Sequence, residues 1–112
     1  MRRPERYHGR QYFYVLDLGG VVKVGVSYSF GLRLREYYKR YPEMALALLL
    51  EFDSRAEAVE LEDRVKRFFV DYIVKGEEYI GVAPGEVVGA VKTISYIIRE
   101  EVALGILPIF YI

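Results

Sequence analysis

Two adjacent glycines, Gly19 and Gly20, constrain the fold of this chain more than any other feature of its sequence. They separate two β-rich runs, "YFYVLD" at residues 12–17 and "VVKVGV" at residues 21–26. Valine, phenylalanine and tyrosine favour strands, and glycine readily adopts the positive φ angles that a tight hairpin turn requires. The pattern therefore predicts an antiparallel β-hairpin, which is the start of a sheet.

A helix and a third strand are predicted after the hairpin. The helix spans residues 30–41, where Pro42 ends it. The apolar run "MALALLLEF", residues 44–52, predicts a buried strand. The helix has an aromatic face because suitable side chains recur at steps of three and four residues: Leu34, Tyr37, Tyr38 and Tyr41.

The clearest helical pattern covers residues 53–74. Ser54, with Glu57 three residues later, forms a capping box that marks its start, and Gly76 follows as a stop signal. An apolar stripe runs along this helix and predicts the face that packs on the sheet. Its members are Ala58, Leu61, Val65, Phe68, Phe69 and Tyr72.

The last part of the chain adds a short strand and a final helix. Residues 77–82 predict the strand, Pro84 begins the helix and Gly105 closes it. The element order is therefore ββ-α-β-α-(β)-α. It predicts an α/β (α+β) fold with a small, largely antiparallel three-stranded sheet flanked by helices. The inner face of the final helix comprises Val87, Val91, Ile94, Ile98 and Val102.

A length of 112 residues suits one domain. Residues 1–10 are polar and basic and predict a flexible arm, so the single domain covers residues 11–112. The tail "ILPIFYI", residues 106–112, is strongly apolar and must be covered by this domain or by another subunit. A homodimer formed through the tail is therefore one option.

Composition excludes several classes of protein. Sixteen basic residues balance sixteen acidic ones, so binding to nucleic acid must depend on a local patch rather than on net charge. The absence of cysteine excludes disulfides, a thiolate nucleophile and cysteine-based zinc sites. The sequence contains no secretory signal and no apolar run of membrane-spanning length. We therefore expect an intracellular, cytoplasmic protein that does not enter a membrane.

One carboxylate occupies an unexpected place on the helix at residues 53–74. Each helical residue advances by roughly 100°, which puts Glu62 between Phe69 and Ile73 at the edge of the apolar stripe. A carboxylate there needs a hydrogen-bond donor, a cation or a metal ion. The alternative is a boundary glutamate whose stem packs while its carboxylate reaches water.

The helix at residues 30–41 presents a second group of interest. Arg33 and Tyr37 are four residues apart and lie on one flank, with Arg40 below them. A planar guanidinium can bind two phosphate oxygens, so this flank suits a phosphate ligand. The alternative is a solvated flank on which an arginine stacks on a tyrosine. His8 and Ser27 do not indicate a serine hydrolase, because no suitable partners accompany them.

These features together resemble the GIY-YIG nuclease family, and its phage-type branch in particular. The matching pieces are "FYV" in the first strand, "KVG" in the second, an arginine eight residues after that glycine, a tyrosine four residues later, and a glutamate on the next long helix. "KGEEYIGV" is similar to the segment that follows the glutamate helix in that branch. The resemblance covers about residues 11–83.

The chain departs from the family pattern at several positions. Tyr12 and Phe13 stand where the first motif has glycine and isoleucine, and Lys23 replaces the second tyrosine, as in the phage-type branch. An asparagine that follows the glutamate helix in several members has no match. The resemblance still assigns motif positions to six residues: Tyr14, Lys23, Gly25, Arg33, Tyr37 and Glu62.

The resemblance implies a divalent-metal-dependent endonuclease that hydrolyses phosphodiester bonds of nucleic acid, DNA in particular. Glu62 would hold one Mg²⁺ or Mn²⁺ ion and Arg33 would bind the phosphate. Gly25 would let the backbone approach the phosphate, while Tyr14 or Tyr37 would orient or deprotonate the attacking water.

Binding of the nucleic acid would depend on four cations of one helix: Arg33, Arg35, Lys39 and Arg40. The alternative is a catalytically weak or inactive module on the same fold, which binds DNA or protein and forms homo-oligomers.

Overall fold

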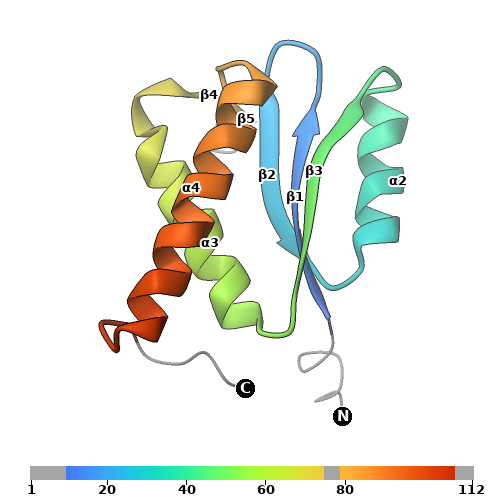
Figure 1. Cartoon of the computed structure of the whole chain (residues 1–112). Helices are drawn as coiled ribbons and strands as arrows, with labels where there is room; N and C mark the ends of the chain where they lie inside the picture. Colours follow the sequence, from blue (N-terminus) through green and yellow to red (C-terminus); the bar gives the residue numbers. More distant parts are fainter. Residues whose placement is uncertain (1–9, 75–78, 108–112) are drawn as a thin grey trace.

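The computed structural model describes residues 10–74 and 79–107 of the chain (Figure 1). Residues 1–9 of the predicted arm, the stop signal at Gly76 and residues 108–112 of the apolar tail lie outside the described residues. The elements, in chain order, are β1 (Gln11–Asp17), β2 (Val22–Ser27), α2 (Phe30–Arg40), β3 (Ala45–Phe52), α3 (Arg55–Phe68), a 3-10 turn (Val70–Tyr72), β4 (Ile73–Val74), β5 (Tyr79–Ile80) and α4 (Pro84–Ala103).

The strands form one antiparallel sheet in the order β3-β1-β2-β5-β4. The three long strands β1, β2 and β3 make up most of the sheet. Two short strands of two residues each, β5 and then β4, are added beside β2. This confirms the predicted α+β class, with a small antiparallel sheet and flanking helices. β1 lies in the middle of the three long strands, so its side chains contribute to both faces of the sheet.

The hairpin between β1 and β2 forms at the predicted glycines. Gly19 and Gly20 have φ angles of 83° and 111°, values that other residues adopt only with strain. The Leu18 N–H donates to the Val21 carbonyl at 2.9 Å, and the Asp17 carboxylate accepts the Gly19 N–H at 2.9 Å. The turn therefore sets the register in which Tyr14 faces Gly25.

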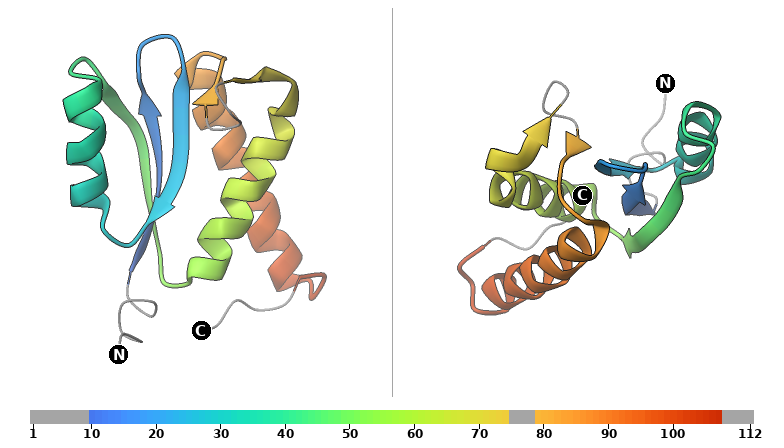
Figure 2. Two further views of the ribbon diagram at one scale, coloured as in Figure 1. Left: turned by 180° about the vertical axis from the view of Figure 1, so that it is seen from behind. Right: turned by 90° about the horizontal axis from the view of Figure 1, so that it is seen from above.

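Two apolar layers lie on opposite faces of the sheet, because successive side chains of a strand point to opposite sides. Phe13 and Val15 of β1 pack in the larger layer, where α3 and α4 cover the sheet. Tyr14 and Leu16 pack in the smaller layer, beneath α2. Figure 2 shows α2 on one side of the long strands and the pair α3 and α4 on the other.

Helix α3 is shorter than predicted. Ser54 accepts the Glu57 N–H at 3.2 Å and starts the helix as expected, but the helix ends at Phe68 rather than at residue 74. The residues that follow are mostly aromatic or β-branched and have modest helix propensity. The chain instead turns into β4, and the Tyr72 carbonyl accepts the Gly81 N–H at 2.7 Å. This pairing of distant segments outweighs the local helical pattern.

Three predicted apolar-face residues are exposed, so those predictions were wrong. Phe68 and Tyr72 are 66% and 54% exposed, because α3 ends at Phe68 and the chain then turns away. Tyr38 is 56% exposed, because the stripe of α2 that faces the sheet is too narrow to include the residue after Tyr37. Other members of the two predicted faces are buried: Tyr37, Ala58, Leu61, Val65 and Phe69.

β3 is an edge strand rather than the buried strand that was predicted. Among the described strands it pairs with β1 alone, and Leu46 and Leu49 are 44% and 39% exposed. Leu48 and Leu50 pack partly against the larger apolar layer, and Phe52 is buried in it. An apolar run alone does not reveal whether a strand has one neighbour or two, which is why this prediction failed.

Helix α4 begins and ends as predicted. Pro84 lies in its first turn, and Gly105 follows its end with a φ angle of 79°. The N–H groups of Gly105 and Ile106 donate to the carbonyls of Val102 and Glu101, which is a Schellman motif. None of the helices in the described part of the chain combines the length and apolar character needed to span a membrane.

Candidate functional site

Tyr14 and Gly25 lie opposite each other on β1 and β2, on the sheet face that α2 covers. A Cβ atom placed on Gly25 would come within 2.6 Å of the Tyr14 Cζ atom. The ring of Tyr14 therefore occupies the space above Gly25. The sequence suggested that this glycine admits a phosphate, but its immediate effect is to make room for the ring.

Tyr14 is buried, with 3% of its surface exposed. Its ring lies 5.5 Å from the Phe30 ring, between centroids, and Tyr37 packs in the same layer. Burial raises the pKa of the Tyr14 phenol well above its usual value, and the neighbouring phenol of Tyr37 raises it further. At neutral pH the hydroxyl of Tyr14 is therefore a hydrogen-bond donor and not a base.

Charged groups from two helices also act on Tyr14. Arg33 of α2 lowers the pKa of the phenol, while Glu62 of α3 and Glu36 of α2 raise it. The pKa of the Tyr14 phenol thus depends on Arg33 and Glu62, two residues that the sequence analysis singled out.

Helix α2 carries the predicted basic patch. The Arg33 side chain is 50% exposed, and its Nη1 lies 3.7 Å from Glu36 Oε1, a weak surface pair. The guanidinium of Arg40 lies over the Tyr37 ring, 5.1 Å from its centroid. The alternative of a flank on which an arginine stacks on a tyrosine is therefore present in the structure, between Arg40 and Tyr37, while the Arg33 side chain stays half exposed. Arg35 and Lys39 are exposed as well.

Glu62 has a cationic partner that the sequence analysis did not single out. Its side chain is 21% exposed, and Lys66, one helical turn later, places Nζ 3.3 Å from Glu62 Oε2. The spacing of four residues is the signal that could have indicated this pair. Glu36 was missed as well, although it lies three residues after Arg33.

The fit of a divalent ion depends on the ligands near Glu62. Among residues 10–74 and 79–107, no three side chains of His, Asp or Glu form a metal-binding group. Mg²⁺ accepts one carboxylate when waters and a substrate phosphate supply the other oxygens. Glu62 therefore fits as the single protein ligand of an ion that arrives with the substrate, provided that Lys66 moves aside.

The remaining predicted residue of the second motif, Lys23, lies on β2 two residues before Gly25. It shares the α2 face of the sheet with that glycine and is half-buried. Ser27, at the end of the strand, is buried, and its Oγ accepts the Ser29 N–H at 2.9 Å. Ser27 thus stabilises the turn into α2, which positions Arg33.

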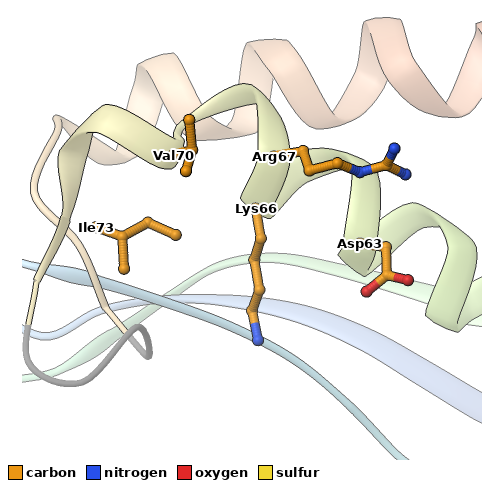
Figure 3. A pocket seen from close by; sticks show the side chains of 5 residues that line it. All are labelled: Asp63, Lys66, Arg67, Val70 and Ile73. Carbon is orange, nitrogen blue, oxygen red and sulfur yellow. The ribbon is translucent and has the colours of Figure 1, made fainter.

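A pocket of about 590 Å³ lies beside the Glu62–Lys66 pair, along α3. Figure 3 shows its lining, in which the side chain of Lys66 extends from α3 in the direction of the sheet strands. Lys66 therefore borders both this pocket and Glu62. The other lining residues are Asp63, Arg67, Val70 and Ile73.

A scan against protein-family models, a search of curated proteins and a search of solved structures found no match to this chain. Function is therefore inferred from the residues of the chain and their arrangement.

Proposed function

We propose that this chain is a divalent-metal-dependent endonuclease that hydrolyses phosphodiester bonds of nucleic acid, DNA in particular. What supports it best is that two charged residues from different helices act on the pKa of the buried Tyr14 phenol of β1: Arg33 of α2 lowers it and Glu62 of α3 raises it. The GIY-YIG resemblance assigned functional positions to these residues. An intracellular location suits such an activity.

Arg33 would bind the scissile phosphate. Its guanidinium is half exposed and can donate to two phosphate oxygens, where it neutralises the charge that grows in the transition state. The other cations of α2, Arg35, Lys39 and Arg40, would hold the neighbouring phosphates of the strand. Only Glu36 opposes this charge within the helix.

Glu62 would hold the metal ion together with the substrate phosphate. A bound Mg²⁺ or Mn²⁺ would stabilise the charge on the leaving oxygen. Lys66 keeps Glu62 neutralised until a substrate and its ion arrive, and this limits binding of the metal alone.

The two tyrosines would orient the attacking water or the phosphate rather than remove a proton from the water. Tyr14 stays protonated at neutral pH because burial raises its pKa, so its hydroxyl can donate to a phosphate oxygen or position the attacking water. Tyr37 is also buried and lies beside it. The proton of the attacking water would then pass to solvent or to a phosphate oxygen.

Cleavage of supercoiled plasmid and of branched DNA with Mg²⁺ or Mn²⁺ tests this proposal. The wild type should cut only with metal, and Glu62→Ala and Arg33→Ala should each lower the rate by about 100-fold or more. Glu100→Ala and Arg99→Ala, which change exposed charges on α4, serve as matched controls and should cut at the wild-type rate. Equal cutting by all five proteins would indicate a contaminating nuclease and would contradict the proposal.

The second candidate is a nucleic-acid-binding module without catalysis. The Glu62–Lys66 pair and the replacement of the second motif tyrosine by Lys23 favour it. In that case no DNA is cut, but binding is weakened by salt. Arg33→Ala should then reduce the slope of log K against log salt concentration by about 0.7 to 0.9, the effect of one lost phosphate contact.

A further inference from the structure

A second pocket, of about 530 Å³, lies where α2 begins and is separate from the one along α3. Its walls include the rings of Tyr12, Tyr28 and Phe30 and the side chains of Leu32 and Leu49. No charged side chain of the described residues lines it, and Tyr28, Leu32 and Leu49 are 42%, 58% and 39% exposed. The pocket is thus an open, uncharged surface on which aromatic rings gather.

A row of rings connects this pocket with the candidate site. The Phe30 ring lies 6.1 Å from the Tyr12 ring and 5.5 Å from the Tyr14 ring, between centroids. The Tyr12 hydroxyl donates to the Glu51 carboxylate at 3.2 Å, which holds that ring at the pocket wall. A group bound in the pocket would therefore lie one ring away from Tyr14.

Two cations of α2 follow residues of the pocket wall at helical spacing. Arg33 and Arg35 come four residues after Ser29 and Gly31, which line the pocket, so each cation is one helical turn from its wall. An uncharged aromatic pocket beside two exposed arginines suits a ligand that joins a flat ring to an anion. A nucleotide has this composition, because its base stacks on aromatic rings and its phosphate binds a guanidinium.

We propose that the pocket at the start of α2 binds an unpaired base of a nucleic-acid strand, with the phosphate of that nucleotide on Arg33 or Arg35. A base paired within a duplex cannot enter, because its faces are stacked on its neighbours. If the chain is the nuclease proposed above, this pocket makes branched, flapped or single-stranded nucleic acid its preferred substrate; this consequence rests on the proposed function. The proposal about binding stands independently of cleavage.

The test uses a short single-stranded oligonucleotide that carries one 2-aminopurine, and the same oligonucleotide in a duplex. Binding to the metal-free wild type should quench the fluorescence of the single strand. The affinity for the duplex should be at least tenfold lower. Tyr28→Ala should weaken binding of the single strand by about 5- to 100-fold, while Tyr28→Phe, which keeps the ring, should stay within about twofold. Tyr96→Ala removes an exposed tyrosine of α4 and is the matched control.

The outcomes separate this inference from the proposed function. Tyr28-dependent binding of the single strand without any cutting would support the pocket and reject the nuclease. Cutting that depends on Glu62, with Tyr28→Ala binding as tightly as Tyr96→Ala, would overturn the pocket and leave the nuclease. Equal affinity, measured by competition with the 2-aminopurine strand, for a strand in which every base is replaced by an abasic site would also overturn it, because binding would then need no base.

Discussion

Tyr14 is the residue on which the fold and the candidate chemistry depend together. Its ring fills the space above Gly25, and its burial raises its pKa. Glu62 and Glu36 add to this effect, while the cationic Arg33 opposes it. The phenol therefore stays neutral, and the positive charge of Arg33 is not consumed by a phenolate and stays available to an anionic ligand.

The raised pKa of Tyr14 predicts a change of stability at alkaline pH. Its pKa in the folded state lies above the unfolded value of 10.0. Below pH 10 the neutral phenol therefore makes its full contribution to the free energy of unfolding. This contribution is lost as pH rises toward the folded pKa. Above pH 10 the free energy of unfolding of the wild type should fall faster than that of Tyr14→Phe, by at most about 1.4 kcal/mol per pH unit.

Urea unfolding at about pH 8, 10 and 11 measures this difference. Tyr96→Phe is the control, since it removes the hydroxyl of a tyrosine that is 65% exposed on α4. A pH dependence of Tyr14→Phe that matches the wild type would show that the Tyr14 phenol ionises normally in the folded protein.

The close packing of the Tyr14 ring over Gly25 predicts a second effect, on the stability of a Gly25 variant. Gly25→Ala would place a Cβ 2.6 Å from the Tyr14 Cζ, so we expect a loss of about 1–3 kcal/mol in the free energy of unfolding. Gly89→Ala is the opposite case, because nothing lies within 4 Å of its added Cβ and the residue is inside α4. It should stabilise the protein by about 0.5–1 kcal/mol. Chemical denaturation compares the two, and a neutral Gly25→Ala would contradict the close packing of the ring.

At the scale of elements, a network of hydrogen bonds between charged side chains joins α3 to α4. Arg64 donates to both carboxylate oxygens of Glu101, at 2.7 Å and 3.2 Å, and its Nε donates to Glu60 at 2.8 Å. The hydrogen bonds from Arg64 lower the pKa of Glu101, and those two carboxylates raise the pKa of Arg64. Arg64 thus links α3 to α4 through charge-assisted hydrogen bonds.

Loss of the Arg64–Glu101 hydrogen bonds should destabilise the protein most at neutral pH. The folded pKa of Glu101 lies below its usual value of 4.5, so its contribution is present above that pH and is lost as pH falls through the folded pKa. Glu101→Gln should lower Tm at pH 7, and the difference from the wild type should shrink toward pH 3. Arg64→Met, which keeps the packed stem, should behave in the same way. An equal difference at both pH values would mean that the charge of Glu101 does not contribute.

At the scale of the whole molecule, β1 joins two apolar layers. The layer beneath α2 includes Leu16, and the layer beneath α3 and α4 includes Leu61. Both side chains are almost fully buried. Because β1 contributes to both faces, loss of packing on one face should weaken the other.

Truncations in the two layers test this coupling. Leu16→Ala and Leu61→Ala should each lower the free energy of unfolding by about 2–5 kcal/mol, a large part of the total of about 5–15 kcal/mol for a small domain. Each variant should unfold in a single transition, followed by circular dichroism and by tyrosine fluorescence, since the chain has 11 tyrosines and no tryptophan. Two separate transitions would show that the layers unfold independently.

Part of the candidate site could be predicted from the sequence. The borders of helical faces pointed to Arg33, Tyr37 and Glu62; the structure packs Tyr37 in the same layer as Tyr14, and the charges of Arg33 and Glu62 act on the pKa of Tyr14. The pocket at the start of α2 was not predicted, because it combines residues of β1, the β2–α2 turn, α2 and β3. Helical spacing shows which side of a helix borders its apolar face, but not which other segments lie next to it.

The sequence by itself determined the hairpin at Gly19 and Gly20, the start of α3 at Ser54, and the two ends of α4 at Pro84 and Gly105. Each depends on the φ angles or capping groups of a few neighbouring residues, and these act locally.

Only the tertiary structure decided that α3 ends at Phe68, that β3 lies at an edge and that the Tyr14 phenol stays neutral. These outcomes depend on strand order and on which helix covers which face. Both follow from contacts between segments far apart in the chain, whose energies outweigh the local preferences of any one segment.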